Sequence, residues 1–303
     1  MLSITFKNIK KQMKFSIIIP THNRRAQLIN CINSIITTTY PKYNYEIIIV
    51  NDNSIDDTEQ YFMKINQSNI RYYNNTGKGP ASARNFGAKI AKGMYLIFID
   101  DDCTIDDNYL WLIDKKTIEF SFSLAGGIII NCSKTKFSKV LEYMTLFYQK
   151  EQNFSDTPKF LTSNNMICLK KDFFEIGGFD ESYTRAGGED RDLSNRFFIS
   201  NKNILFFQDL IVFHHHNLDL KSFFKQQYNY GLGAHILRKK NKELKIKKNK
   251  ILKIHFNMII SIFKSKNILD GFCYSLIVIL SQLIVTLGYI SSSLLIKREN
   301  KIE

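Results

Sequence analysis

The sequence has few of the residues that cross-link a chain. Among its 303 residues there are five cysteines, which lie far apart and form no CxxC pair. An odd and scattered set of this kind argues against a disulfide framework and against a structural zinc site. We therefore expect a protein of a reducing compartment, the cytoplasm. The cysteines are Cys31, Cys103, Cys132, Cys168 and Cys273.

The sequence also lacks a recognisable leader and an internal repeat. No apolar segment of the signal-peptide type precedes the first expected strand, so we expect no secretory leader. The one biased tract is rich in Lys and Asn. Hydrophobic residues make up 44% of the chain, which is enough for a full core and argues against wholesale disorder. The length fits one large α/β domain or two smaller ones.

Acidic residues are outnumbered. The chain has 28 Asp and Glu against 42 Lys and Arg, which gives a net charge of +14. Much of this excess lies between Arg238 and Lys253, where nine basic residues accompany one acid, Glu243. Such a run fits binding to nucleic acid or to an anionic membrane surface. A solvated basic face of a Lys-rich chain is the plainer alternative.

An apolar segment follows the basic run. Leu269 to Ile296 holds 28 residues with one charge, Asp270, and basic residues flank it on both sides. This length exceeds the roughly 20 residues that a membrane span needs. A basic run before an apolar helix also describes a helix that lies in the membrane interface. Three interpretations stay open: a single span, an in-plane or re-entrant anchor, and a soluble packing or oligomer helix.

The first hundred residues alternate between short apolar runs and helical patterns. We expect strands at 15–19, 45–50, 70–73 and 94–99, the first of them ending at Pro20. Helices are expected at 25–38 and 81–91, with Gly93 just beyond the second. Alternation of this kind predicts an α/β protein with a mostly parallel central sheet flanked by helices.

Polar clusters follow three of these strands. They are Pro20 to Asn23, Asn51-Asp52, and the three consecutive aspartates Asp100, Asp101 and Asp102. The carboxyl ends of parallel strands meet at one edge of an open sheet, where ligands bind. Like charges at one turn repel one another, so a cation is expected to offset them. Carboxylates suit Mg²⁺ or Mn²⁺ held together with substrate phosphates, although a solvated acidic turn is the alternative.

Five motifs in order resemble those of family 2 glycosyltransferases, which are inverting enzymes of the GT-A fold, a Rossmann-like α/β architecture. Residues 16–24 (SIIIPTHNR) resemble the family's opening strand, and residues 46–54 (EIIIVNDNS) resemble its second strand. Residues 79–87 (GPASARNFG) resemble its GxxxARNxG helix, and residues 98–102 (FIDDD) resemble its metal motif. Residues 177–180 (GGFD) and 187–190 (GGED) resemble its acceptor-side block. Two departures are His22, where Tyr is common, and Asn51, where Asp is common.

The resemblance implies a role for each matching residue. Pro20, Thr21 and Asn23 would line the base and ribose, and Asp52 would accept from the imide N–H of uracil. Arg84 would lie near the base or diphosphate, and Asp190 would be the general base with Glu189 as its neighbour. Asp100 would reach the ribose and the donor sugar, and Asp101 would lie beside it without a separate role. Asp102 would be the direct metal ligand, supported by Asp100 and His214. Asn164 and Asn165 would lie near the acceptor.

The resemblance also implies cofactors, partners and a place of action. We expect Mg²⁺ or Mn²⁺, a nucleotide-sugar donor (a UDP-sugar), and a glycan or lipid-linked acceptor in surface-polysaccharide or cell-envelope synthesis. The expected division is an N-terminal extension (1–14), a catalytic domain (15–218) and a basic, apolar helical tail (219–303). Within the catalytic domain, 15–103 would bind the nucleotide sugar and 104–218 the acceptor. Through Arg238–Lys253 and the apolar tail, the chain would bind the cytoplasmic face of the cell membrane. No nucleic acid is expected, and a homodimer is left open.

Two alternatives come from other classes. A nucleotidyltransferase on a related fold would need a Gly-rich loop with Lys or Arg after the first strand, and this chain has Pro20-Thr21-His22-Asn23 there. A non-catalytic basic protein that binds membranes or nucleic acid would leave the acidic strand ends unexplained, because they repel phosphates. Two further sets of residues have structural interpretations. Tyr143, Phe147 and Tyr148 are expected in the core or stacked on an acceptor sugar, and Tyr228, Tyr230, Gly231 and Gly233 at a helix–helix junction.

Overall fold

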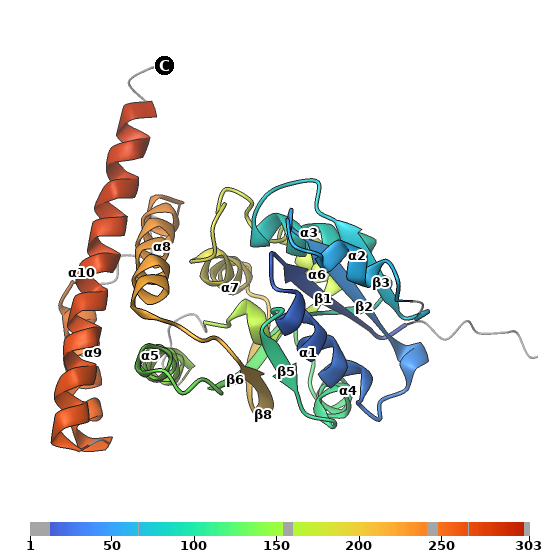
Figure 1. Cartoon of the computed structure of the whole chain (residues 1–303), viewed down its shortest axis with the longest axis horizontal. Helices are drawn as coiled ribbons and strands as arrows, with labels where there is room; N and C mark the ends of the chain where they lie inside the picture. The colour runs from blue at the N-terminus through green and yellow to red at the C-terminus, as the bar shows by residue number, and fades with distance from the viewer. Residues whose placement is uncertain (1–12, 66, 154–159, 241–247, 266, 300–303) are drawn as a thin grey trace, which may run out of the picture.

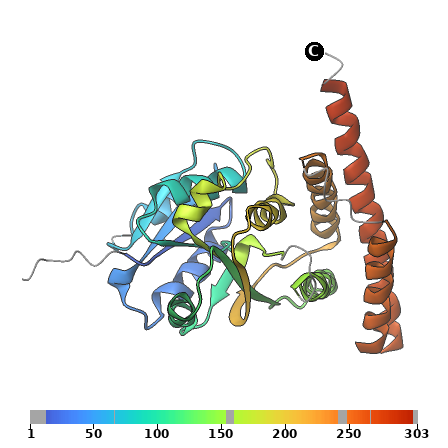
Figure 2. The same cartoon turned by 180° about the vertical axis from the view of Figure 1, so that it is seen from behind.

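The computed structural model describes residues 13–65, 67–153, 160–240, 248–265 and 267–299. Two parts are visible in Figure 1: a sheet with helices on both faces, and a group of helices beside it. Figure 2 shows from behind that the C-terminal helices gather on the same side of the sheet-bearing part. Most of the expected N-terminal extension (1–14) lies outside the described residues, as does the middle of the basic run.

One eight-stranded sheet carries the fold. Its order is β3-β2-β1-β4-β7-β6-β8-β5. The first four strands in this order are parallel, whereas β7 is antiparallel to both β4 and β6, and β5 is antiparallel to β8. The expected α/β class is confirmed, but the second half of the sheet is more mixed than a mostly parallel one. The strands are β1 (Phe15–Thr21), β2 (Tyr45–Asn51), β3 (Ile70–Asn74), β4 (Tyr95–Phe98), β5 (Cys103–Ile105), β6 (Leu124–Asn131), β7 (Met166–Leu169) and β8 (Ile204–His214).

Both faces of the sheet are buried, because its apolar strands alternate between two cores. Ile17 and Ile19 of β1 enter one core, which α1 and α4 cover, and Ile18 enters the other, beneath α3, α6 and α7. The helices of this part are α1 (Arg25–Ile36), α2 (Thr58–Phe62), α3 (Pro80–Ile90), α4 (Tyr109–Glu119), α6 (Lys170–Glu175) and α7 (Glu189–Ile199), with short 3₁₀ turns at Lys42–Asn44 and Ser163–Asn165.

The remaining helices share a third core. They are α5 (Lys136–Asn153), α8 (Leu220–Lys240), α9 (Lys248–Ser265) and α10 (Ile268–Glu299). Val140 and Met144 of α5 pack with Phe223 of α8, Met258 of α9 and Val278 of α10. A helix of the expected acceptor half is therefore packed into the tail. Helix α10 is long and apolar enough over Ile268–Leu294 to be a candidate membrane span.

The expected helix–helix junction is confirmed on α8. A Cβ atom at Gly231 would overlap the carbonyl oxygen of Val285 in α10, and one at Gly288 would overlap that of Tyr228. These two glycines therefore let the backbones of α8 and α10 touch.

Polar strand ends converge as expected. The Asp52 amide donates to the Thr21 carbonyl over 2.8 Å, which joins the ends of β1 and β2. The first strand runs through Pro20 to Thr21 rather than ending at Pro20. The strand β5, directly after the acidic turn, was not expected. It pairs with the end of β8, with Cys103 opposite His214.

Candidate active site

Arginines offset the acidic turn between β4 and β5. Nη1 of Arg24 donates to Asp101 over 3.0 Å and to Asp102 over 2.9 Å. The Thr21 hydroxyl also donates to Asp101 over 2.7 Å. Burial raises the pKa of Asp101 to about 6, although the charge of Arg24 opposes the shift. The cation that the sequence led us to expect is thus partly supplied by the protein, and Asp101 holds Arg24 and the end of β1 in place.

Asp102 faces the histidines at the end of β8. Nε2 of His214 lies 3.2 Å from Oδ1 of Asp102, and the amide of His215 donates to the Asp102 carbonyl over 2.8 Å. Burial is the largest single effect and acts against charge on both side chains. Their hydrogen bond and the nearby opposite charges together outweigh it, so the pKa of Asp102 is lowered and that of His214 is raised. Burial lowers the pKa of the neighbouring His216 to about 4, which leaves that ring neutral.

Asp102, Cys103 and His214 form a candidate donor set for a divalent cation. Donor atoms of Asp102, Cys103 and His214 all lie within 4.8 Å of one another. Burial raises the pKa of the Cys103 thiol well above its ordinary value, so this group stays protonated and is a poor ligand. One carboxylate with one imidazole suits a transition-metal cation such as Mn²⁺ better than Mg²⁺, which prefers oxygen ligands.

The expected base-binding residues hold the loops around them. The Asp52 carboxylate accepts from the Gly79 amide over 2.9 Å and from the Asn75 side chain over 3.0 Å. Asp52 therefore fixes the start of α3, where a negative charge is stabilised by the helix dipole. Asn23 adopts a φ of 55° and accepts from the Ile55 amide over 2.7 Å. Pro20 is buried in β1.

Arg84 joins the two halves of the site. Its side chain is 4% exposed, and it donates to Asp100 over 2.7 Å and to Glu189 over 3.2 Å. Its guanidinium lies 5.5 Å from the centre of the Phe179 ring. Asp100 follows β4, whereas Glu189 begins α7, so one buried cation ties the acidic turn to the acceptor-side block.

Glu189 and Asp190 have different surroundings. The second oxygen of Glu189 accepts from the Gly187 amide over 2.8 Å, so both of its oxygens are engaged. Asp190 is partly buried and accepts from the Arg191 amide over 2.7 Å. Burial, and then the charge of Glu189, raise the pKa of Asp190 to about 7 against the opposing charges of Arg191 and Arg84. These contacts favour Asp190 over Glu189 as a group that exchanges a proton near neutral pH.

Several expected acceptor residues have structural contacts instead. The Asn165 amide donates to the carbonyls of Ile128 and Leu210 and accepts from the Tyr109 hydroxyl over 2.7 Å, so it cross-links the sheet. Asn164 is buried beside it, and its side-chain oxygen has no partner within the described residues. The aromatic residues of α5 face the tail: Tyr143 bonds to Ser261, Tyr148 lies 2.7 Å from His255, and Phe147 packs in the third core.

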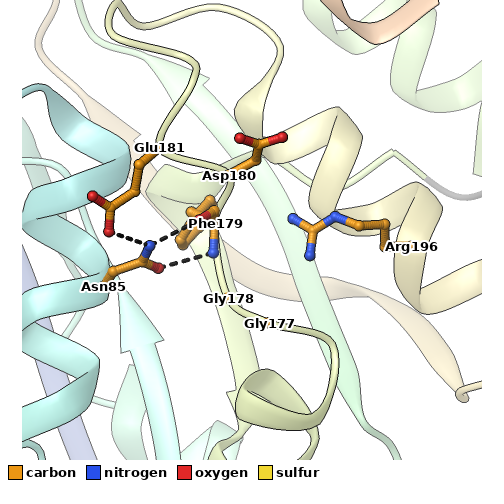
Figure 3. A pocket seen from close by; sticks show the side chains of 7 residues that line it. All are labelled: Asn85, Gly177, Gly178, Phe179, Asp180, Glu181 and Arg196. Atoms are coloured by element: carbon orange, nitrogen blue, oxygen red, sulfur yellow. Dashed lines mark hydrogen bonds between the residues drawn. The ribbon is translucent and has the colours of Figure 1, made fainter. Parts of the chain in front are cut away.

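A pocket of about 410 Å³ lies beside the site (Figure 3). It is lined by Asn85 of α3, the 177–181 loop and Arg196 of α7, and it contains none of the expected site residues. The Asn85 side chain exchanges hydrogen bonds with the Phe179 backbone, 2.8 Å each way, and donates to Glu181 over 2.9 Å. Asn85 thus fixes the loop whose Phe179 ring contacts Arg84. We assign the pocket a supporting role, because the candidate carboxylates lie elsewhere.

Sequence reasoning missed three residues of this site. Arg24 stood within a quoted motif, but nothing local indicated that it would pair with carboxylates beyond residue 100. Arg191 lies over the Phe160 ring at 4.7 Å and acts electrostatically on Asp190. Tyr230 of α8 lies against the Gly187 backbone, and the negative charges of Asp190 and Glu189 act on its phenol. No signal in the sequence places Tyr230 there.

Comparisons with known proteins indicate the family of the chain. The family described as "Glycosyl transferase family 2" matches residues 16–177, and "N-terminal domain of galactosyltransferase" matches residues 142–216. An uncharacterised glycosyltransferase of Rickettsia felis is 35% identical over 137 residues, 45% of this chain and 21% of that protein. TarS of Staphylococcus aureus, a poly(ribitol-phosphate) beta-N-acetylglucosaminyltransferase, is 35% identical over 102 residues, 32% of this chain and 18% of that protein. The chain thus matches only about a fifth of the length of these relatives.

Solved structures share the fold. A mannosyltransferase from Pyrobaculum calidifontis in complex with GDP-Man and Mn²⁺ has a TM-score of 0.66 at 12% identity, over 92% of this chain and 86% of that one. Residues 1–349 of TarS in complex with UDP-GlcNAc have a TM-score of 0.55 at 16% identity, over 95% and 92%. The architecture is therefore the GT-A fold. Together with the family match over more than half of its length, it shows that the chain belongs to glycosyltransferase family 2.

Proposed function

We propose that this chain transfers a sugar from a nucleotide-diphosphate sugar to a glycan or lipid-linked acceptor in cell-envelope synthesis. One observation carries the proposal: the buried Arg84 binds Asp100 of the acidic turn and Glu189, the neighbour of Asp190. The guanidinium of Arg84 thereby links the proposed donor site to the segment that carries the candidate base. Family membership favours sugar transfer over nucleotidyl transfer and over a non-catalytic role.

The proposed reaction is a single displacement with inversion. The acceptor hydroxyl is a weak nucleophile until a carboxylate takes its proton, and a base titrating near neutral pH is suited to that step. The pKa of Asp190, raised to about 7, meets this requirement. Asp190 would take the proton, while Glu189 keeps Arg84 and the Gly187 amide in place.

The donor end is proposed to bind a divalent cation and a nucleotide. Asp102 and His214 would hold the cation, with Mn²⁺ preferred, and when bound it would stabilise the negative charge of the leaving diphosphate. Asp52 is fixed by the Gly79 amide and would accept from an imide N–H, which favours UDP. The neighbours carry GDP-Man with Mn²⁺ in one case and UDP-GlcNAc in the other, so both nucleotides belong in the test.

A donor screen with the purified protein tests this proposal. Nucleotide release would be measured with UDP-, GDP- and TDP-sugars in the presence of Mn²⁺. Asp190→Asn should slow release by about 10²–10⁴-fold, the usual contribution of a positioned base. The variant should keep the rise in melting temperature that UDP and Mn²⁺ cause in the wild type. Asp107→Asn, on an exposed carboxylate in the turn before α4, is the control. Loss of UDP binding in Asp190→Asn would indicate a structural role instead.

The tail is proposed to bind a membrane in plane through α10. The exposed positions of this helix between 268 and 294 are apolar with the exception of Thr286. Its buried side, by contrast, includes Ser275, Ser281 and Ser292. A soluble helix has the opposite arrangement, so the outward stripe is suited to lipid. The stripe consists of Leu269, Phe272, Leu276, Ile279, Leu280, Leu283, Leu287, Ile290 and Leu294.

Packing favours an in-plane helix over a span. Helix α10 lies against α8, and α8 exposes Lys221, Arg238 and Lys239. A spanning α10 would carry these charges into hydrocarbon at roughly 2.5–3.5 kcal/mol each. Helices α9 and α10 lie at the side of the molecule farthest from the sheet (Figures 1 and 2). Exposed Lys253 and Lys264 of α9 are available for anionic headgroups.

A further inference from the structure

Helix α8 touches the candidate active site as well as α10. The glycines of the turn before α7 have φ values of 142° at Gly187 and 108° at Gly188. A Cβ atom at Gly233 of α8 would overlap the carbonyl oxygen of Gly187. Backbone of the tail and backbone of the turn are therefore in direct contact, and Glu189 and Asp190 follow this turn immediately.

Two further contacts fasten the same region. A Cβ at Gly187 would lie 3.1 Å from both the Asn229 carbonyl oxygen and Cδ1 of Tyr230, so the Tyr230 ring bounds the turn on one side. At the end of α8, Lys240 bonds to Asp180 and donates to the Ser182 hydroxyl over 2.7 Å. Its ammonium also lies 5.5 Å from the centre of the Tyr183 ring. The helix thus holds both the turn and the loop that precedes it.

Tyr230 lies against the turn that leads into Glu189 and Asp190, and the charges of these acids act on its phenol. Although 36% of this residue is exposed, burial of its phenol and then the charges of Asp190 and Glu189 raise its pKa. Gln226, one turn earlier on α8, donates to the Tyr230 hydroxyl over 2.9 Å and fixes the ring. The tail therefore contributes one ordered side chain to the surroundings of Asp190.

We propose that α8 is a positioning element of the active site, in which Tyr230 and Gly233 seat the Gly187–Gly188 turn and so hold the Asp190 carboxylate in place for proton transfer. The inference rests on the proposed function of Asp190 as the base. If α8 has this role, sugar transfer requires the tail even under conditions in which it does not require membrane attachment. Tyr230 acts through the turn and is a positioning residue rather than a catalytic one.

Two pairs of variants in the full chain test this proposal. Gly233→Ala forces the helix off the turn. Its control is Gly271→Ala on α10, where the added Cβ is crowded by the movable Phe263 ring and meets the Phe263 Cα only at an ordinary contact distance of 3.6 Å. Tyr230→Ala removes the ring that bounds Gly187, and Tyr230→Phe restores it. Nucleotide release with water as acceptor would be measured from UDP-glucose, UDP-N-acetylglucosamine or GDP-mannose, whichever the wild type uses. Amide hydrogen exchange of residues 185–192 is the second readout.

We expect Gly233→Ala and Tyr230→Ala to slow release by about tenfold to a hundredfold, because a misplacement of 1 Å can cost that much. Both should speed amide exchange of residues 185–192 and keep the melting shift with UDP and Mn²⁺. Gly271→Ala should match the wild type, and Tyr230→Phe should recover most of the loss. Wild-type release and exchange in both Gly233→Ala and Tyr230→Ala would overturn the proposal. If the wild type itself releases no nucleotide, the proposed function fails. Amide exchange of residues 185–192 then tests by itself whether α8 holds the Gly187–Gly188 turn.

Discussion

Replacing Arg84 by methionine should be the most damaging single change in the donor half. Methionine keeps a long apolar stem against Phe179 but leaves Asp100 and Glu189 without their shared cation. The side chain of Glu189 is 5% exposed, so its charge cannot turn to water. Removing one partner of a buried ion pair destabilises a protein by roughly 3–5 kcal/mol.

This magnitude can be converted into a melting temperature. An unfolding entropy of about 2.1 cal/mol/K per residue gives roughly 0.6 kcal/mol/K for a chain of this length, so Arg84→Met should melt on the order of 5–8 °C lower. Arg25→Met is the matched control, because its partner Asp57 is exposed and such surface pairs contribute about 1 kcal/mol or less. The assay is thermal and urea unfolding of the two variants beside the wild type.

A double variant tests whether uncompensated buried charge causes the destabilisation of Arg84→Met. Glu189→Gln removes one of the two uncompensated charges, so Arg84→Met with Glu189→Gln should be more stable than the sum of the single effects by about 1 kcal/mol or more. If Arg84→Met melts within 2 °C of the wild type, or if the two changes simply add, the buried guanidinium does not hold the halves together as the structure indicates.

Three more predictions follow from the site and the tail. Because Asp190 has its folded pKa raised from 3.8 to about 7, nucleotide release should rise with pH through about 7 and then level off, whereas Asp57→Asn, on an exposed carboxylate, should not alter that profile. The folded state holds this proton longer than the unfolded state, so the free energy of unfolding should fall as the pH rises from about 4 to about 7. The raised pKa of Asp101 adds to this fall up to about pH 6, so Asp190→Asn should reduce the fall without removing it, and an unchanged fall would refute the shift. Asp102→Ala and His214→Ala should each abolish the rise in melting temperature caused by Mn²⁺ with UDP, while His22→Ala, on an exposed ring of the first loop, keeps the Mn²⁺-dependent part; a normal Mn²⁺ response in His214→Ala would remove His214 from the metal site. Leu276→Ser with Leu283→Ser should weaken sedimentation with phosphatidylglycerol vesicles by at least about tenfold, since each buried Leu contributes roughly 1.5–3 kcal/mol, and Met63→Ser with Ile118→Ser should not; unchanged sedimentation together with loss of a dimer would make the stripe an interface between copies.

The sequence was sufficient to predict the edge of the sheet and the carboxylates that lie there. Runs such as Ile17–Ile19 and Tyr95–Phe98 are short, apolar and rich in β-branched or aromatic residues, so they predict buried strands. Polar residues that follow such parallel strands must gather at one edge of the sheet. Asp52 and Asp100 were placed correctly on these grounds. Periodicity alone did not indicate β5, because a strand of three residues leaves no pattern to detect.

The sequence did not predict which residues from distant segments would come into contact. Arg24 directly precedes α1 and Arg84 lies within α3, and nothing local shows which carboxylates folding brings to them. Glu189 differs from Asp190 through its bonds to Arg84 and to the Gly187 amide. The amphipathic pattern of α5 predicted a buried face but not which helices would cover it. The expected core position of its aromatic residues is confirmed, and the helices of the tail form that core. The spacing of Gly231 and Gly233 predicted close packing of a helix, but not that Gly231 would meet α10 and Gly233 the Gly187–Gly188 turn.

The pairing of β5 with β8 sets an order of events during synthesis. The acidic turn leaves the ribosome early, whereas His214, at the end of the last strand, follows only after more than a third of the chain has been added. N-terminal segments fold first as the chain emerges. Until β8 arrives, Arg24 is the cation available to Asp101 and Asp102 from the same segment. A nascent chain can therefore pair its first four parallel strands with the acids neutralised internally, and Asp102 meets His214 only when the last strand closes the sheet.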